Sequence, residues 1–152
     1  MECSTAVSVW RAVVLLALLA GSGGAHGAER QVVLVVSATS PVQQLDPIEV
    51  QKLFLGLPVV RDDHVLRPLR NVSDEQLANI FLQYVVAMSQ SAYDRRILVQ
   101  VLQQGRPRPA ELRTSKQLIE ALAADRYAVS YMWLRDVPAN PHMRILRVLW
   151  TE

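Results

Sequence analysis

The sequence predicts an α/β fold, a mixed β-sheet with packed helices, and three observations support that class. Residues 31–37 form an apolar, β-branched run of strand length. Segments 46–57 and 73–88 combine helix-capping residues with apolar residues at helical spacing. Two further short apolar runs, 127–133 and 143–149, follow each other near the end of the chain. Strands that first alternate with helices and then follow one another directly indicate mixed strand directions.

The first predicted strand, Gln31–Ser37, is apolar at successive positions, which is typical of an interior strand covered on both faces. The first predicted helix begins after Asp46, a capping residue, with Pro47 at the first helical position. The Glu49 side chain is placed to accept a hydrogen bond from the backbone N–H of Asp46, as in a capping box. Gly56 supplies the stop signal at the C-terminal end.

A second strand is expected over Val65–Arg70, where Pro68 favours a place at a sheet edge or at a strand end. The second predicted helix begins at Ser73, since the sequence from Ser73 to Gln76 matches a capping box. Apolar residues then recur at helical spacing as far as Met88.

A third helix is expected from Ser91, ending at Gly105 before two prolines, and a fourth over 115–124. Their predicted buried residues are Ile97, Leu98, Val101 and Leu102 in the third helix and Leu118, Ile119 and Leu122 in the fourth. Each of these sets lies on one helical face, which is expected to pack against the sheet.

The chain is expected to close with strands over 127–133 and 143–149, separated by the turn-forming residues 136–141. Tyr131 and Trp133 alternate with the residue between them, so they share one face of their strand. That face is expected to lie in the core.

Composition excludes several classes of protein. The chain has 152 residues, 51% of them hydrophobic, and a single cysteine, which excludes a disordered tail and a disulfide-stapled small protein. Mean hydropathy is +0.15 and the formal net charge is +2. That basic excess is too small, and the aromatic residues too scattered, to predict nucleic-acid binding.

The N-terminal residues have the pattern of an export signal. Arg11 precedes nine apolar residues, Ala12–Ala20, and a run of small residues follows. Cleavage after Gly27 fits the small-residue rule, and cleavage after Ala25 or Ala28 fits nearly as well. An uncleaved membrane anchor is the alternative, but the apolar run is short for a bilayer span.

With cleavage after residue 27, the expected division is a signal peptide, 1–27, and one domain, 28–152, located in the periplasm. The mature protein is expected to have no stable membrane insertion. No internal repeat or low-complexity linker divides residues 28–152.

Four motifs, in this order and spacing, resemble the small periplasmic proteins of the phosphate ABC transporter substrate-binding type. They are LVVSATSPVQQLDPIEVQKLFLGL (34–57), VLRPLRNVSDEQLANIFLQYVV (65–86), QQGRPRP (103–109) and YAVSYMW (127–133). The resemblance covers nearly all of the predicted domain. It implies a reduced periplasmic-binding-protein-like domain of type 2, a small oxyanion such as phosphate as ligand, an ABC permease or an envelope protein as partner, and no cofactor.

The resemblance points to Arg70 and Ser73 as ligand-binding residues. A helix N-terminus presents unpaired N–H groups to an anion, and a guanidinium can donate two parallel hydrogen bonds to it. The family's glycine-rich run is absent here, and Asp74 and Glu75 bring negative charge to the first turn. The alternative from the residues themselves is that Ser73 only caps its helix and that Arg70 is a surface strand end. If Arg70 is a ligand on an exposed strand end, Arg70→Ala is expected to abolish oxyanion binding and to leave thermal stability nearly unchanged.

The hydroxyls of Ser37, Thr39 and Ser40 are the other candidate ligands. They follow the first strand, and ligands of α/β sheets commonly bind at strand carboxyl ends. An ordinary polar turn before Pro41 is an equal alternative. Arg106–Pro109 together with Arg113 fits either a basic docking patch or a solvated, proline-stiffened loop, and the loop is the favoured interpretation.

No catalytic motif is present in the sequence, and the protein is not expected to be an enzyme. His64 and His142 are isolated in the sequence, so no metal site is expected. The leading hypothesis is an exported solute-binding-like protein for a small oxyanion. The alternative is an envelope protein without a transport role, which uses a degenerate binding-protein fold for interaction.

Overall fold

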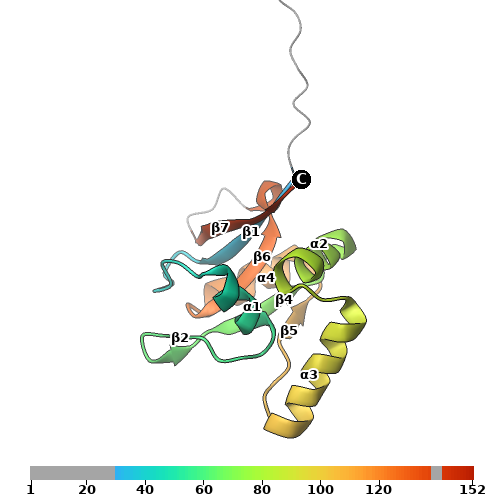
Figure 1. Cartoon of the computed structure of the whole chain (residues 1–152). Helices are drawn as coiled ribbons and strands as arrows, with labels where there is room; N and C mark the ends of the chain where they lie inside the picture. Colours follow the sequence, from blue (N-terminus) through green and yellow to red (C-terminus); the bar gives the residue numbers. More distant parts are fainter. Residues whose placement is uncertain (1–29, 138–141) are drawn as a thin grey trace, which may run out of the picture.

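The computed structural model describes residues 30–137 and 142–152. A five-stranded sheet forms the centre, with α1, α2 and α3 on one side and α4 on the other (Figure 1). The elements are β1 (Gln31–Ser37), α1 (Pro47–Phe54), β2 (Val60–Arg61), β3 (His64–Val65), β4 (Arg67–Asn71), α2 (Glu75–Ile80), the π-helix η1 (Phe81–Val86), α3 (Gln90–Gln104), β5 (Ala110–Leu112), α4 (Ser115–Ala124), β6 (Ala128–Trp133), the 3₁₀ turn η2 (Leu134–Asp136) and β7 (Met143–Thr151).

The expected signal peptide, 1–27, and residues 138–141 of the expected turn lie outside the described residues. No helix in the described part of the chain is long and apolar enough to span a membrane.

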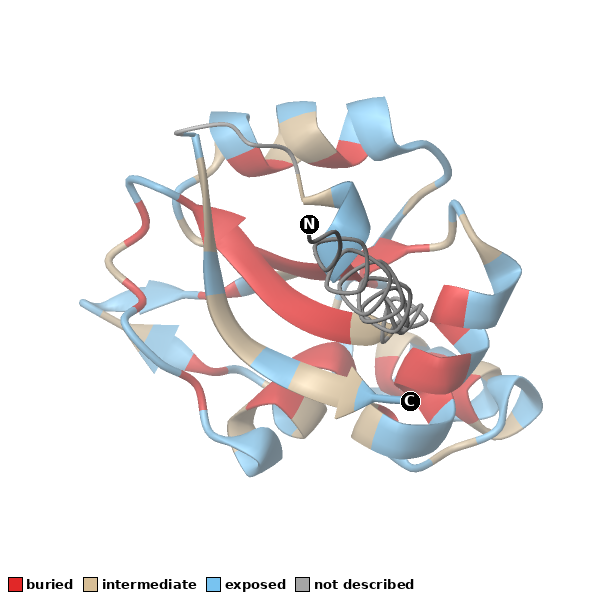
Figure 2. Cartoon of the chain, turned by 90° about the horizontal axis from the view of Figure 1, so that it is seen from above, coloured by how far each residue is buried: buried red, intermediate tan, exposed pale blue. Residues whose placement is uncertain are grey.

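The sheet has the strand order β5-β4-β6-β1-β7. β1 runs antiparallel to both of its neighbours, β6 and β7, whereas β4 runs parallel to both β5 and β6. The predicted mixed α/β fold is therefore confirmed. The prediction that residues 31–37 form an interior strand is also confirmed, because β1 lies between two partners and Val32–Val36 are fully buried (Figure 2).

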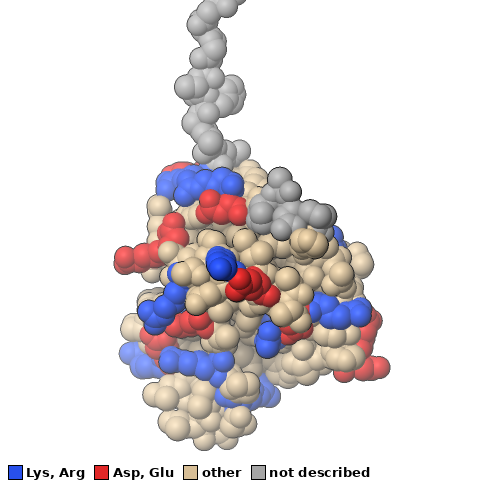
Figure 3. All heavy atoms as spheres, turned by 180° about the vertical axis from the view of Figure 1, so that it is seen from behind, with Lys and Arg blue, Asp and Glu red and all other residues tan. Residues whose placement is uncertain are grey.

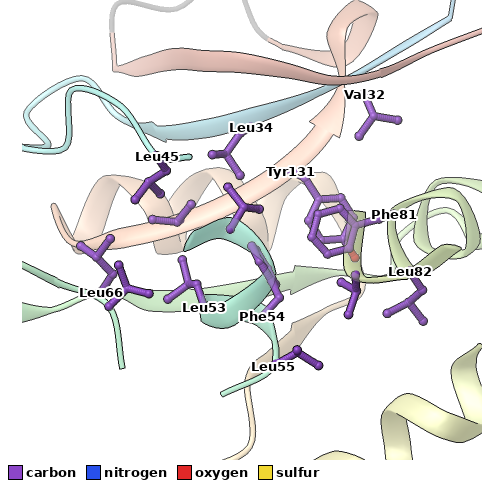
Figure 4. Packing of buried hydrophobic residues seen from close by; sticks show 14 of the residues in the cluster. Val32, Leu34, Leu45, Leu53, Phe54, Leu55, Leu66, Phe81, Leu82 and Tyr131 are labelled. Atoms are coloured by element: carbon purple, nitrogen blue, oxygen red, sulfur yellow. The ribbon is translucent and has the colours of Figure 1, made fainter. Parts of the chain in front are cut away.

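The two faces of the sheet bury two apolar clusters. The larger cluster lies on the side of α1, η1 and α3, where the rings of Phe81 and Tyr131 stack with centroids 3.6 Å apart and Phe54 meets both edge-on (Figure 4). Met132 belongs to the smaller cluster, which packs under α4. Tyr131 and Trp133 thus share a core face opposite Met132, as the alternation predicts.

The first helix follows its sequence signals, and the second departs from them. Glu49 accepts a hydrogen bond from the backbone N–H of Asp46, as in the predicted capping box. The predicted cap at Ser73 is wrong: Asp74 caps α2 and accepts from the N–H of Leu77 at 3.0 Å. The segment continues as the π-helix η1 and stops at Ala87, whose φ is +61°.

The predicted buried face of the third helix is partly wrong. Leu98 and Leu102 on α3 are 54% and 75% exposed, and the buried side chains are those of Tyr93, Ile97 and Gln100. Apolar residues occur on both sides of this helix, so spacing alone does not select the buried face. In α4, Leu118 and Leu122 are buried as predicted, whereas Ile119 is only half-buried.

The sequence did not predict β5 or the β2–β3 hairpin. The hairpin turns at Asp62 and Asp63, whose positive φ angles are typical of tight hairpin turns. Pro68 is the second residue of β4, so its strand-end position is confirmed, but β4 lies inside the sheet and not at its edge.

Two glycines with positive φ end helical segments and provide a matched test. A Cβ on Gly56 (φ +77°) would lie 2.5 Å from Oε1 of the buried Gln100, whereas a Cβ on Gly105 (φ +61°) would meet nothing within 4 Å. We therefore expect both Gly105→Ala and Gly56→Ala to cost about 1 kcal/mol of unfolding free energy through backbone strain, with a further loss at Gly56 because the end of the Gln100 side chain has to shift. Urea denaturation checks both values. Equal losses would contradict a tight fit of the Gln100 side chain against Gly56.

Candidate functional site

Arg70 lies near the carboxyl end of β4 and is buried. Its neighbour Leu69 packs in the cluster under α4, so by strand alternation Arg70 points to the opposite face, toward α3. The side chain is only 3% exposed. The alternative interpretation of Arg70 as a surface strand end is therefore wrong.

Four side chains contact the guanidinium: those of Glu111, Gln90 and Tyr93 described next, and that of Tyr131, whose hydroxyl lies within hydrogen-bonding reach of Arg70. Nη1 donates to Oε1 of Glu111 at 2.8 Å, and Nη2 donates to Oε1 of Gln90 at 3.3 Å. The ring of Tyr93 lies 4.5 Å from the guanidinium carbon, in cation–π geometry. The Nε atom is buried and has no hydrogen-bond partner among the described residues. The site thus combines a balanced charge with one buried N–H for which the described residues offer no acceptor of good geometry.

The two tyrosines near Arg70 are neutral donors. Burial raises the pKa of Tyr93 to about 12 and raises that of Tyr131 as well, with the Arg70 charge opposing both increases. The Tyr93 hydroxyl donates to the carbonyl of Phe54 at 2.8 Å, and that of Tyr131 donates to the carbonyl of Asn71 at 3.0 Å. Neither hydroxyl supplies negative charge at neutral pH, so Glu111 is the counter-ion of Arg70.

Ser73 and Asp74 lie at the start of α2. The Ser73 hydroxyl and backbone N–H both donate to Oδ1 of Asn71, at 2.6 and 3.1 Å. Asp74 accepts from the N–H of Leu77 and, at 3.1 Å, from Nε1 of Trp133. The backbone hydrogen bond from Leu77 is the main cause that lowers the pKa of Asp74. An ionised carboxylate therefore occupies this helix start at neutral pH.

The structure does not bring Ser37, Thr39 and Ser40 to Arg70. Ser37 follows Val33 and Val35 onto the face of α4, whereas Arg70 points to the other face. The strand register places Ser37 level with Arg67, which is two strands away and three residues before Arg70. By the usual spacings of a sheet, Ser37 and Arg70 are therefore about 14 Å apart.

These three hydroxyls have local partners. Ser37 Oγ lies 3.0 Å from Thr39 Oγ1, and Ser40 Oγ accepts from the N–H of Val42 at 3.3 Å. The Ser40 carbonyl accepts from Arg144 at 3.1 Å. This pattern is that of a turn tied to β7.

Sequence reasoning missed Glu111, Gln90 and Tyr93. Glu111 lies directly opposite Arg70 because β5 pairs in parallel with β4, and β5 has only three residues and no strand signal of its own. Tyr93 is four residues before Ile97, so helical spacing could have placed it on the buried face.

The segment Arg106–Pro109 is a loop, as the favoured interpretation predicts, and it is largely exposed except at its end. Pro109 is buried, and Nη1 of Arg106 donates to the carbonyl of Gly56 at 3.3 Å. Arg113, the other residue of the expected basic patch, is exposed.

The charges on the face away from the Arg70 site are mixed in sign. On the face opposite to Figure 1, basic and acidic side chains are interspersed and form no broad field of one sign (Figure 3). Among residues 30–137 and 142–152, no group of three or more His, Cys, Asp or Glu side chains is placed to hold a metal ion.

Comparisons with known proteins support the resemblance at the level of the fold. No protein-family model and no curated protein sequence matches the chain. Solved structures that match include a protein from Clostridium perfringens described as a phosphate ABC transporter substrate-binding protein with bound phosphate (TM-score 0.55, 9% identity, 78% of this chain and 45% of that one).

An ABC-type phosphate transport receptor from Vibrio cholerae also matches (TM-score 0.50, 10% identity, 78% of this chain and 46% of that one). PstS from Borrelia burgdorferi is a third match (TM-score 0.55, 11% identity, 78% of this chain and 47% of that one). The chain therefore has the fold found in phosphate ABC transporter substrate-binding proteins and spans less than half the length of these structures.

The burial of Arg70 reverses the expectation that its removal is harmless to stability. Arg70→Ala loses the Tyr93 contact and empties a buried space, whereas the exposed Glu111 side chain can turn to water, so we expect a cost of about 2 kcal/mol in unfolding free energy. Arg67→Ala is the matched control on the same strand: its side chain is 56% exposed, and its pair with Asp125 is worth about 0.5 kcal/mol. Chemical denaturation that gave equal losses would contradict a structural role for the buried guanidinium.

Proposed function

We propose that the protein is an exported solute-binding-type domain that recognises a small oxyanion through Arg70, with the Ser73 hydroxyl as a second donor once it exchanges its bond to Asn71 for the ligand. The observation that carries the proposal is the buried guanidinium whose Nε–H has no acceptor among the described residues. It occurs in a fold shared with a structure that holds bound phosphate. An oxyanion oxygen is the kind of acceptor that a buried guanidinium N–H favours.

Binding requires Glu111 to move. Its carboxylate already accepts from Nη1, so an incoming dianion would meet a negative charge in the same place. The Glu111 side chain is 37% exposed, and it can exchange its bond to Arg70 for water at moderate cost. The proposal therefore includes weak binding with Glu111 in place and tighter binding once its charge is removed.

The proposed ligand set is smaller than the sequence suggested. Phosphate is too small to reach both Arg70 and the turn at Ser37–Ser40, which lies on the other face of the sheet. We therefore retain Arg70 and Ser73 as the proposed ligands and leave the three hydroxyls of that turn outside this site.

Export to the periplasm and a permease or envelope partner are parts of the same proposal. Support for export comes from the apolar run Ala12–Ala20 with its small-residue exit. Support for a transporter partner comes from the kind of protein that shares the fold.

A second candidate function is an interaction module with no ligand. The carboxylates of Glu111 and Asp74, at Arg70 and at the start of α2, favour it because they already satisfy the groups that an anion would use. The chain spans less than half the length of the matching structure with bound phosphate, and this favours an interaction module as well.

Isothermal titration of the purified protein with phosphate and with sulfate tests the proposal. We expect weak saturable binding, at least tenfold weaker binding for Arg70→Lys because the planar fork is lost, and tighter binding for Glu111→Gln. Arg96→Gln removes an exposed charge on α3 and serves as the control without effect. If folded wild type and folded Glu111→Gln both gave no binding, the oxyanion proposal would be wrong and the interaction module would be favoured.

A further inference from the structure

A pocket of about 470 Å³ lies apart from the Arg70 site. It is bounded by the end of α1 and the residues after it, by the link from β3 to β4, and by the segment Arg106–Pro109. Arg70, Ser73, Glu111 and Gln90 do not line it. The volume falls within the range of about 300–1,000 Å³ that is usual for small-molecule sites.

The lining combines an apolar floor with positive charge. Leu53, Leu57 and Leu66 supply apolar surface, and three arginines, Arg67, Arg106 and Arg108, are the charged residues of the lining. No acidic residue of the described chain lines the pocket. An occupant that matches this surface has an apolar body and a negative group.

The charge of Arg106 is the least compensated of the three. Arg67 pairs with Asp125 at 3.0 Å, and Arg108 lies 3.4 Å from Asp94. Arg106 donates at 3.3 Å to the carbonyl of Gly56 and has no carboxylate partner among residues 30–137 and 142–152. Arg106 is half-buried as a residue, and only one of its N–H groups has a described acceptor, so several of its donors remain for an acidic group.

The segment that carries Arg106 is held in place before any ligand binds. α3 ends at Gly105 in the left-handed conformation, and Pro107 and Pro109 fix two backbone angles in the next four residues. Pro109 is buried, and β5 begins at the next residue. A pocket formed by such a segment loses little conformational entropy on binding.

We propose that this pocket binds a small amphipathic anion, a molecule with an apolar body and one carboxylate or sulfonate group, and that Arg106 binds the acidic group. Inorganic phosphate does not suit it, since the apolar floor offers that ion no partners. The pocket is thus a second site, different in chemistry from the one around Arg70.

Two fluorescent probes with one shared body test the proposal. 8-Anilinonaphthalene-1-sulfonate carries a sulfonate, and N-phenyl-1-naphthylamine has the same aromatic body without it. We expect the full-length protein to bind the sulfonate probe at least about tenfold more tightly, because a charge-assisted bond to a guanidinium is worth about that factor. Octanoate is expected to displace the bound sulfonate probe, and octan-1-ol at the same concentration is not.

Variants locate the binding. Arg106→Gln is expected to lower the affinity for the sulfonate probe about tenfold and to leave the affinity for the neutral probe unchanged. Arg113→Gln removes the same charge from an exposed residue outside the pocket and is expected to change neither. Leu102→Ser removes a side chain of α3 that is 75% exposed and also outside the pocket, and it too is expected to have no effect.

Three results would overturn the proposal. Equal affinity for the two probes would show that the acidic group is not recognised. Equal losses for Arg106→Gln and Arg113→Gln would show a general effect of charge. Loss of binding in Leu102→Ser but not in Arg106→Gln would place the probe on the apolar surface of α3. Circular dichroism of each variant establishes that it is folded.

Discussion

The burial of one guanidinium organises the side of the protein that carries α3. Arg70 comes from β4, its counter-ion Glu111 from β5, and Gln90 and Tyr93 from the first turns of α3, so one charge joins three elements. A buried charge without such partners would be strongly unfavourable, which fixes where these elements meet. The same contacts account for the orientation of α3, which turns Tyr93 and Ile97 inward and leaves Leu98 outside.

Local chemistry predicted most of the elements, because their signals lie within a few residues of one another. The cap and proline at Asp46–Pro47 and the glycine stops at Gly56 and Gly105 are examples. The pairing of β4 with β5 is different: it depends on residues about forty positions apart, and nothing in Ala110–Leu112 indicates a strand. The counter-ion of Arg70 was therefore beyond sequence reasoning, although Arg70 itself was not.

Strand direction explains why the predicted site divides in two. Ser37 was grouped with Arg70 on the rule that ligands gather at strand carboxyl ends, which assumes parallel strands. β1 runs antiparallel to β6, whereas β4 runs parallel to it, so the carboxyl end of β1 lies level with the beginning of β4. Alternation along β1 then turns Ser37 to the face of α4. The residues were suitable for an anion, but the topology separates them.

The central claim is that an oxyanion binds the buried Nε–H of Arg70, which has no acceptor among the described residues. NMR of the arginine Nε–H signals during a phosphate titration tests it most directly, with the Arg70 signal assigned from its absence in Arg70→Lys. The account predicts a saturable shift of that signal, larger in Glu111→Gln. A signal that stays unshifted at saturating phosphate in both proteins would contradict it.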